Sequence, residues 1–416
     1  MSIRNGIVLS LAAAAVGFAS QVHAAQVGTV FVIAMENHNW TQPNPSSAPL
    51  QILGNTAAPF INSLVTPGNP NAAQVSYSSN YLNAGIGDHP SEPNYIWAEA
   101  GTNYNKDTSF TVNNDSDPTV ANNNIFSTTP HLTGQMNAAG VTWSNYQEDY
   151  QIANSTTPTG GSPLVSKSGT STTVTNPYYG TNQYNYAAKH NPMAFFSDTG
   201  TQNVKTFDSL RSDIAADTVS VSNPTATSNF GQYNWITPNQ YNDMHSSLST
   251  NFTYNGTTYS AGTDQEAVAM GDNFLATIIP QIMATQAYKN NGAIVIWNDE
   301  TEKSGSSSAD DAGHTSMEIV ISPLAKGNAY ASSVELNHSS DIKTMEEIFG
   351  LSFINNTLPA SEPYGGTAGL NSVPSANDFS DLFQANAITT AVPEPASVGL
   401  LAIGGLTLLS RRRKNA

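Results

Sequence analysis

The segment 88–101 places a serine at the expected start of a helix. Ser91 is a good N-cap residue, Pro93 suits the first turn of a helix, and Gly101 can end one. Spacing alone favours a simple helix cap. The functional alternative puts the Ser91 hydroxyl among the free N–H groups of a helix N-terminus, which favour a phosphoryl group, with Asn94 as a donor to a phosphoryl oxygen.

Two polar pairs follow two apolar runs of the sequence. Glu36-Asn37 comes after the run 28–35, and Asp299-Glu300 comes after the run 292–297. An isolated acidic pair is usually solvated. Ligand sites of parallel sheets lie beyond the carboxyl ends of the strands, so two such pairs at two strand ends favour a shared cation site.

A third candidate is the stretch 236–245, in which Asp243 and His245 stand two residues apart. In a loop, their oxygen and nitrogen ligands can turn toward one metal ion. Taken alone, the stretch is better explained as a polar turn opened by Pro238-Asn239. His314 and His338 follow later in the chain and are further candidates.

These side chains need a scaffold of strands and helices. Short apolar, β-rich runs predict strands buried on both faces at 28–35, 292–297, 317–322 and, as a shorter candidate, 235–237. Helical patterns occur at 264–288 and 339–349. Strands that alternate with helices predict an α/β domain with a largely parallel central sheet flanked by helices.

The remaining stretches divide the chain. Sequence rich in Asn, Thr, Ser, Gly and Tyr at 103–129 and 151–186 predicts long polar surface insertions. The loosely patterned stretch 359–391 predicts a linker. We therefore expect one folded domain over residues 25–358.

Residues 1–24 have the features of a signal peptide. Arg4 precedes an apolar run from 7 to 19, and the small residues Val22 and Ala24 suit cleavage by signal peptidase after Ala24. The alternative is a buried N-terminal helix. We expect signal peptidase to remove the segment and the protein to be exported.

Residues 392–416 have the features of a second sorting segment. Val392-Pro393-Glu394-Pro395 precedes an apolar run of roughly 15 residues, and Arg411-Arg412-Arg413-Lys414 follows it. This order resembles the PEP-CTERM sorting signal of Gram-negative bacteria. The resemblance implies transient anchoring in the inner membrane, cleavage by an exosortase-type protease, and delivery to the cell surface or extracellular matrix. The alternative is an ordinary C-terminal anchor, a transmembrane helix.

The composition excludes several kinds of function. The 416 residues include 14 Lys and Arg against 31 Asp and Glu, a net charge of −17. This acidity argues against nucleic acid and anionic membrane surfaces as binding partners. Without cysteine there is no disulfide, no thiolate zinc site and no cysteine nucleophile. Arg211 is the only arginine outside the terminal segments, so an arginine clamp on phosphate is not expected.

Seven stretches resemble, in chain order, the motifs of the phosphoesterase family that holds bacterial acid phosphatases, phospholipases C and fungal secreted acid phosphatases. They are Phe31 to His38 (FVIAMENH), His89 to Ile96 (HPSEPNYI), Trp143 to Asp149 (WSNYQED), Lys189 to Pro192 (KHNP), Thr237 to His245 (TPNQYNDMH), Asp299-Glu300, and His338 to Leu351 (HSSDIKTMEEIFGL). The resemblance runs from about residue 28 to 352 and implies an alkaline-phosphatase-like α/β fold.

The resemblance also implies roles for individual residues. Ser91 matches the nucleophile, and His89 or His338 would assist proton transfer to the leaving group. Asn94 and Asn37 would contact the substrate. The positions at or near a metal are Glu36, Asn37, Asp243, His245, Asp299 and Glu300. The sequence after residue 300 departs from the glycine-rich pattern of relatives, so His314 carries less weight.

The expected activity is hydrolysis of a phosphoric ester. A divalent cation (calcium, magnesium, manganese or zinc) would offset the negative charge of the site. Ser91 would attack the phosphorus of a small-molecule or lipid phosphate ester, and water would clear the phosphoserine. One alternative is a phosphodiesterase of lipids or nucleotides. The other is a non-catalytic cell-surface or matrix protein on a retained fold.

Overall fold

The structure of the chain is a computed structural model. It describes residues 25–42, 51–83, 90–102, 117–118, 125–126, 129–150, 167–168, 185–219, 223–302, 314–356 and 369–388. The signal segment 1–24, His89, the tail 392–416 and most of the two polar insertions lie outside the described residues.

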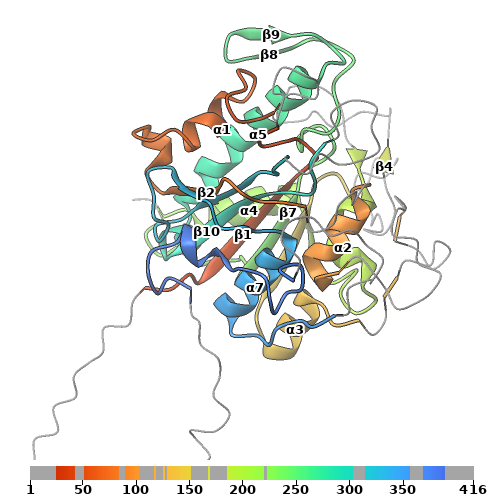
Figure 1. The fold of residues 1–416 in the computed structure, drawn as a ribbon. Coiled ribbons are helices and arrows are strands. Elements are labelled where there is room, and N and C mark those ends of the chain that lie inside the picture. The colour runs from red at the N-terminus through yellow and green to blue at the C-terminus, as the bar shows by residue number, and fades with distance from the viewer. Residues whose placement is uncertain are drawn as a thin grey trace, which may run out of the picture.

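An eight-stranded sheet forms the centre of the molecule (Figure 1). Its spatial order is β12-β2-β11-β10-β1-β7-β3-β6. The strands are β1 (Thr29–Met35), β2 (Val75–Ser78), β3 (Trp143–Gln147), β6 (Val204–Thr206), β7 (Tyr233–Thr237), β10 (Gly292–Asn298), β11 (Glu318–Ile321) and β12 (Tyr330–Ser332). Two small hairpins lie apart from this sheet, β4 (Lys167–Ser168) with β5 (Asn185–Tyr186) and β8 (Phe252–Tyr254) with β9 (Thr257–Tyr259).

The sheet is largely parallel, as the sequence predicts. β1 lies between β10 and β7 and runs parallel to both, and β3 and β6 continue the parallel set. The predicted strand 317–322 forms as β11, but it runs antiparallel to both of its neighbours. Met35 pairs with Asn298 at the ends of β1 and β10, so the residues after these two strands emerge side by side.

Both faces of the sheet are covered by helices (Figure 1). Alternate residues of β1 point to opposite faces: Phe31, Ile33 and Met35 join one apolar core, and Val30, Val32 and Ala34 join the other. The first core also contains residues of α1 (Pro59–Leu64), α4 (Phe207–Asp217) and α5 (Asp264–Ala284). The second contains residues of α2 (Glu92–Ala100), α3 (Leu132–Ala139) and α7 (His338–Phe349).

The predicted helices form, with adjusted bounds. The pattern at 264–288 divides into α5 and the short α6 (Gln286–Lys289), because Thr285 leaves the helical conformation and caps the second helix with its side chain. α7 begins one residue before the predicted 339, where the Asn337 side chain accepts from the backbone N–H of Ser339. Short 3₁₀ turns are η1 (Pro70–Ala72), η3 (Ala188–His190), η4 (Pro192–Phe195) and η5 (Phe379–Leu382).

Residues 369–388 belong to the folded core, whereas the sequence predicted a linker over 359–391. Val373, Phe379, Leu382 and Phe383 are buried in the second core. Their irregular spacing matches neither the helix nor the strand period, which is why the pattern gave no signal. Within the described part of the chain, none of the helices is long and apolar enough to cross a membrane.

Candidate active site

Polar side chains converge beyond the carboxyl ends of the parallel strands. Glu36 follows β1, Asp299 follows β10, and Asp243 lies in the turn after β7. Two backbone hydrogen bonds tie these segments together: Glu36 N–H donates to the Asp243 carbonyl (2.9 Å), and Asp299 N–H donates to the Met35 carbonyl (3.3 Å). The sheet therefore brings together residues that lie more than 260 positions apart in the chain.

Ser91 directs its hydroxyl into this cluster. It stands immediately before α2, but its backbone is helical (φ −58°, ψ −39°) and its side chain makes no capping hydrogen bond. The hydroxyl instead donates to Glu36 Oε2 at 3.0 Å. Ser91 therefore occupies the N-cap position that spacing alone favoured, but its hydroxyl faces the site instead of capping the helix.

Glu36 is the centre of the cluster. Besides Ser91, the Tyr95 hydroxyl donates to its Oε1 atom at 2.8 Å. His190 Nε2 approaches the same Oε1 atom at 3.2 Å, and the ring of Tyr95 stacks on the ring of His190 with centroids 4.9 Å apart. The Glu36 carboxylate is fully buried, so these neighbours replace its contact with water.

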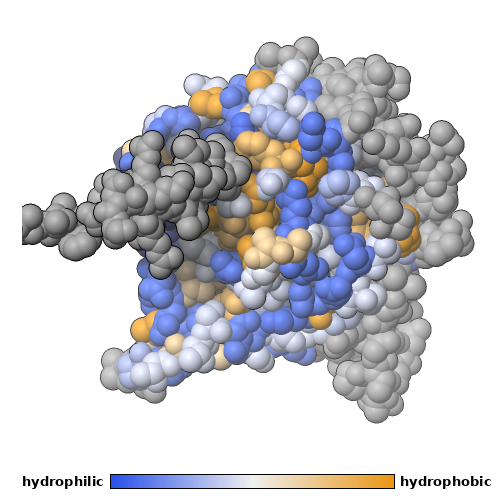
Figure 2. Space-filling model, turned by 90° about the horizontal axis from the view of Figure 1, so that it is seen from below, coloured by the Kyte–Doolittle hydropathy of each residue, from blue (hydrophilic) through white to orange (hydrophobic). Residues whose placement is uncertain are grey.

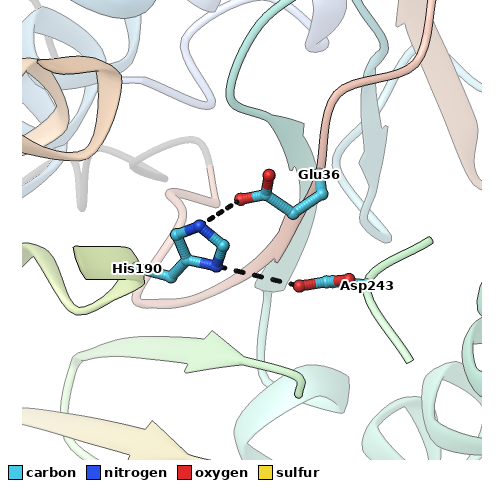
Figure 3. Close-up of side chains that lie close together, drawn as sticks. All are labelled: Glu36, His190 and Asp243. Atoms are coloured by element: carbon cyan, nitrogen blue, oxygen red, sulfur yellow. Dashed lines mark ion pairs between the residues drawn. The ribbon is translucent and has the colours of Figure 1, made fainter. Parts of the chain in front are cut away.

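His190 lies between two carboxylates (Figure 3). Its Nδ1 atom is 3.9 Å from Asp243 Oδ2, and neither ring nitrogen forms a hydrogen bond. Burial lowers the pKa of His190 well below its usual value, and nearby Lys189 and His245 lower it further. His190 is therefore a neutral imidazole at pH 7, and it does not neutralise the carboxylates beside it.

Burial and the charge of Glu36 raise the pKa values of both Asp243 and Asp299, and Glu300 adds to the effect on Asp299. Among the described residues, the charge of Lys189 lowers the pKa of Asp243 but does not outweigh the effects that raise it. Asp243 Oδ2 and Asp299 Oδ2 are buried without a hydrogen-bond partner. Arg211 forms an ion pair with Asp208 on α4.

A divalent cation fits this imbalance. One ligand atom each from Glu36, His190 and Asp243 lies within 4.8 Å of the others, and all three residues are buried. Carboxylate oxygens with one neutral imidazole suit manganese, zinc or another divalent ion. Asp299 and Glu300 border this group without belonging to it.

Asn94 and Asn37 lie next to the acidic residues. The Asn94 side-chain amide donates to Glu300 Oε2 at 3.1 Å from the first turn of α2. Asn37 is half-buried and follows Glu36 directly. Both predicted substrate contacts therefore lie beside Glu36 or Glu300.

His338 has a different place from the one expected. Its Nε2 atom donates to the backbone carbonyl of Asp299 at 2.5 Å, and its Nδ1 atom accepts from Trp297 Nε1 at 3.2 Å. The Tyr81 hydroxyl is 2.6 Å from the same Nδ1 atom. Burial lowers the pKa of His338 to about 4. His338 thus holds the Asp299 peptide in place and is not positioned as a proton donor to a leaving group.

The other predicted histidines lie outside the cluster. His245 is exposed, with its ring centroid 6.2 Å from that of His190, and only its backbone N–H binds Asp243, at 2.9 Å to Oδ1. His314 is buried and its Nδ1 atom lies 2.9 Å from the Glu302 carbonyl oxygen. His89 lies outside the described residues.

Sequence analysis missed His190 and Glu148 as site residues. Both were part of quoted motifs, but neither follows an apolar strand that would have predicted its position. Glu148 follows β3 and accepts from the Asn239 backbone N–H (2.9 Å) and the Asn242 side chain (2.7 Å). These bonds fix the turn that carries Asp243. Burial raises the pKa of Glu148 to about 7.

Curated proteins similar to this chain are phosphatases. A phosphatidylinositol-3-phosphatase of Mycobacterium tuberculosis is 23% identical over 317 residues, which is 76% of this chain and 78% of that protein. A probable acid phosphatase of Kluyveromyces lactis is 26% identical over 162 residues, which is 38% of this chain. The match spans only 30% of the Kluyveromyces protein.

Solved structures show a general likeness. A protein in the alkaline phosphatase superfamily from Vibrio parahaemolyticus aligns with a TM-score of 0.46 and 9% identity, over 79% of this chain and 68% of that one. The lipoteichoic acid synthase LtaP of Listeria monocytogenes aligns with a TM-score of 0.45 and 10% identity, over 84% and 77% of the two chains.

Two family models match the sequence. Residues 391–414 match the PEP-CTERM protein-sorting motif. Residues 37–352 match the Phosphoesterase family, a span that contains every described strand of the central sheet after β1 and every residue of the cluster after Glu36. The chain belongs to the Phosphoesterase family.

Proposed function

We propose that this protein is an exported, metal-dependent phosphoric-ester hydrolase in which Ser91 is the nucleophile. Membership of the Phosphoesterase family supports the class of reaction. The observation that carries the proposal is the orientation of Ser91. Its hydroxyl makes no capping hydrogen bond and donates instead to Glu36, inside a buried group of carboxylates whose pKa values are raised at Asp243 and Asp299.

In the proposed reaction, Ser91, Glu36 and the N-terminus of α2 have separate roles. Ser91 Oγ attacks the phosphorus, the bond from phosphorus to the leaving oxygen breaks, and the serine becomes phosphorylated. Glu36 Oε2, at 3.0 Å, and the Asp299 carboxylate both bond the Ser91 hydroxyl, so either carboxylate can accept its proton. The N-terminus of α2, a nine-residue helix, offers backbone N–H groups and the positive end of its dipole to the phosphoryl oxygens. Water then hydrolyses the phosphoserine.

Glu36, His190 and Asp243 would hold the metal ion, with Asp299 and Glu300 beside them. When bound, a divalent cation would offset the carboxylate charge, favour ionisation of the Ser91 hydroxyl and stabilise the phosphoryl oxygens. The proposal allows calcium, magnesium, manganese or zinc as this cation. His338 supports the site through the Asp299 backbone.

The substrate is proposed to be a phosphate monoester. The named activities of the Mycobacterium and Kluyveromyces relatives are both phosphatase activities, which favours a phosphatase over a phosphodiesterase or phospholipase C. The PEP-CTERM match supports export and sorting to the surface. Removal of residues 1–24 by signal peptidase, transient anchoring in the inner membrane of a Gram-negative cell, and cleavage by an exosortase-type protease are parts of the same proposal.

Ser91→Ala tests the nucleophile. With p-nitrophenyl phosphate as substrate, we expect turnover to fall by about three powers of ten or more, because only electrostatic catalysis remains. The variant should still fold, with a melting temperature lowered only by the loss of the hydrogen bond to Glu36, because Ser91 makes no capping bond. Trapping of labelled phosphate on the wild-type protein and not on the variant is the second readout.

Activity of the variant within about tenfold of wild type would assign the attack to another group. A wild-type protein that hydrolyses neither p-nitrophenyl phosphate nor its phosphocholine and bis-diester analogues, with metal supplied, would favour the non-catalytic surface protein instead.

A further inference from the structure

Both ends of the folded domain leave from one edge of the sheet (Figure 1). Val27 N–H donates to the Ala387 carbonyl at 3.0 Å, so the first and last described segments lie side by side. Gly28 N–H donates to the carbonyl of Asn291, which directly precedes β10. This edge is therefore formed by the amino ends of β1 and β10.

The active site lies at the opposite edge. Glu36 and Asp299 follow the carboxyl ends of the same two strands. A seven-residue strand such as β1 spans about 23 Å at the usual rise of about 3.3 Å per residue. The catalytic cluster and the point where the chain leaves the domain thus face away from each other.

The sorting segment begins almost at the surface of the domain. Ile388 is still buried, the matched sorting motif starts at residue 391, and its apolar run starts at Ala396. The eight residues from 388 to 396 span at most about 28 Å when fully extended. A domain of about 360 residues is roughly 50 Å across. The connection is too short for the opposite edge to turn toward the membrane that holds the apolar run.

The edge formed by the amino ends of β1 and β10, where both ends of the described domain lie, is called here the chain-exit edge. It also carries the exposed large hydrophobic residues of the described part of the chain, Val219 and Phe353. Val219 follows α4 and stands next to Thr218, which pairs with Thr285 just before α6. Phe353 follows α7, whose last residue, Phe349, contacts the first residue of β7. Figure 2, the view from below, shows hydrophobic residues gathered near the middle of this face with hydrophilic residues around them.

We propose that the anchored protein rests with this chain-exit edge against the membrane that holds its own sorting segment, and that its active site opens away from that membrane. In this state its substrates are phosphate esters that arrive from outside, in solution or on polymers, and not the lipids of the anchoring bilayer. The statement about substrates rests on the proposed phosphatase activity, whereas the statement about orientation rests on the proposed membrane anchoring together with the chain exits and the connection length.

Single cysteines can test the orientation, because the chain has none of its own. Phe353→Cys and Val219→Cys would report on the chain-exit edge. Thr257→Cys is the matched control, exposed on the β8–β9 hairpin away from that edge (Figure 1). Each full-length variant carries a fluorophore and is reconstituted in phosphatidylcholine vesicles with or without lipids spin-labelled at the headgroup.

We expect the spin-labelled lipid to quench the labels at 353 and 219 several-fold more than the label at 257. Equal quenching at the three positions, or stronger quenching at 257, would overturn the orientation. Because the readout is fluorescence, it does not depend on whether the protein is an active phosphatase.

The same vesicles test the substrates. Phosphatidylinositol 3-phosphate is placed either in the vesicles that carry the protein or in separate vesicles at equal total lipid, and p-nitrophenyl phosphate is assayed in both samples. We expect hydrolysis of the soluble ester in both samples and no faster hydrolysis of lipid in the protein's own vesicles. Faster hydrolysis there would overturn the statement about substrates. Failure to hydrolyse the soluble ester would contradict the proposed function and leave the quenching result standing.

Discussion

Two buried histidines of this protein each lie between two carboxylates, and they differ in how well the protein satisfies them. His131 Nδ1 lies 2.9 Å from Glu99 Oε2, and its Nε2 atom lies 3.0 Å from Asp198 Oδ1. Both contacts are hydrogen bonds. His190 has carboxylate oxygens at 3.2 and 3.9 Å, and neither ring nitrogen is hydrogen-bonded.

In the cluster around His131, both ring nitrogens and Glu99 Oε2 are hydrogen-bonded without a ligand, and Glu99 Oε1 is the atom left without a partner. Burial works against the charged ring, but the hydrogen bonds and charges of Glu99 and Asp198 outweigh it and raise the pKa of His131. Thr133 adds two further hydrogen bonds to Glu99, from its backbone N–H and from its hydroxyl. Because Glu99 belongs to α2 and His131 precedes α3, the cluster joins two helices and has a structural role.

In the cluster around His190, both ring nitrogens and one oxygen each of Asp243 and Asp299 have no hydrogen-bond partner. Its histidine is neutral, and burial together with neighbouring carboxylates raises the pKa values of Asp243 and Asp299. The same residue types therefore give a structural ion pair in one place and a candidate metal site in the other. The difference lies in whether the buried groups satisfy one another, and that can be tested.

Metal removal should have the largest effect. We expect a chelator to reduce activity by several powers of ten and to lower the melting temperature, because the buried carboxylates then repel one another. Stabilisation by added metal should grow with concentration above the dissociation constant. Glu36→Gln and Asp299→Asn should each weaken this response, as measured by thermal unfolding against metal concentration. A protein that elemental analysis shows to be metal-free and that keeps full activity would refute the metal-dependent mechanism.

His190→Ala should have the second largest effect, on activity and metal affinity. Loss of one ligand or of its orientation typically costs about 10- to 100-fold in metal affinity or activity. Without metal, the variant should be destabilised only by the cavity left beside the Tyr95 ring, because His190 forms no hydrogen bond that is lost. Calorimetric metal titration and turnover at saturating metal separate weak binding from poor catalysis. Unchanged metal affinity in the variant would place the ion elsewhere.

The sequence predicted the strands that became β1, β7, β10 and β11 because they contain apolar runs, and it singled out Glu36, Asp299 and Ser91 because they follow such strands or begin a helix. It did not predict β2, β3, β6 and β12, which are short or contain many polar residues. His190 could not be found this way. It lies in a 3₁₀ turn after a polar insertion, and only the folded chain brings it to Glu36, 154 positions away. The role of His338 was equally hidden, because its partner is a backbone carbonyl, which no residue pattern marks.

His131→Ala should affect stability and leave catalysis alone. Removing one partner of a buried ion pair leaves Glu99 without its counter-charge and costs about 3 kcal/mol of unfolding free energy. Urea unfolding at pH 6 measures this loss. Turnover of the folded variant should match wild type, because this cluster contains none of the residues around Ser91. A loss of turnover as large as that of His190→Ala would erase the distinction between the two histidines.

The pH dependence of stability should distinguish the two histidines more finely. The pKa of His131 is higher in the folded protein than the value of about 6.5 expected in the unfolded chain. Its charged ring therefore contributes fully to the free energy of unfolding below about pH 6.5, and this contribution is lost as pH rises through the folded pKa. The stability difference between wild type and His131→Ala should therefore shrink as pH rises above about 6.5 and through the raised pKa of His131. His190→Ala is the control. Since folding lowers the pKa of His190, its ring is neutral in both the folded and the unfolded protein above about pH 6.5. The stability difference between wild type and His190→Ala should therefore not change with pH above that value.

His245→Ala should have the smallest effect, although the sequence placed His245 at the metal. The side chain is exposed, its ring lies 6.2 Å from the His190 ring, and Asp243 binds only its backbone N–H, which alanine retains. We expect turnover within about threefold of wild type, because an exposed side chain away from the reacting groups contributes little. Metal affinity in the same calorimetric titration should be unchanged. The comparison with His190→Ala is direct, because the two rings are neighbours that differ in burial. A loss of metal affinity equal to that of His190→Ala would mean that His245 turns inward when the metal binds, and the site would then have two imidazole ligands instead of one.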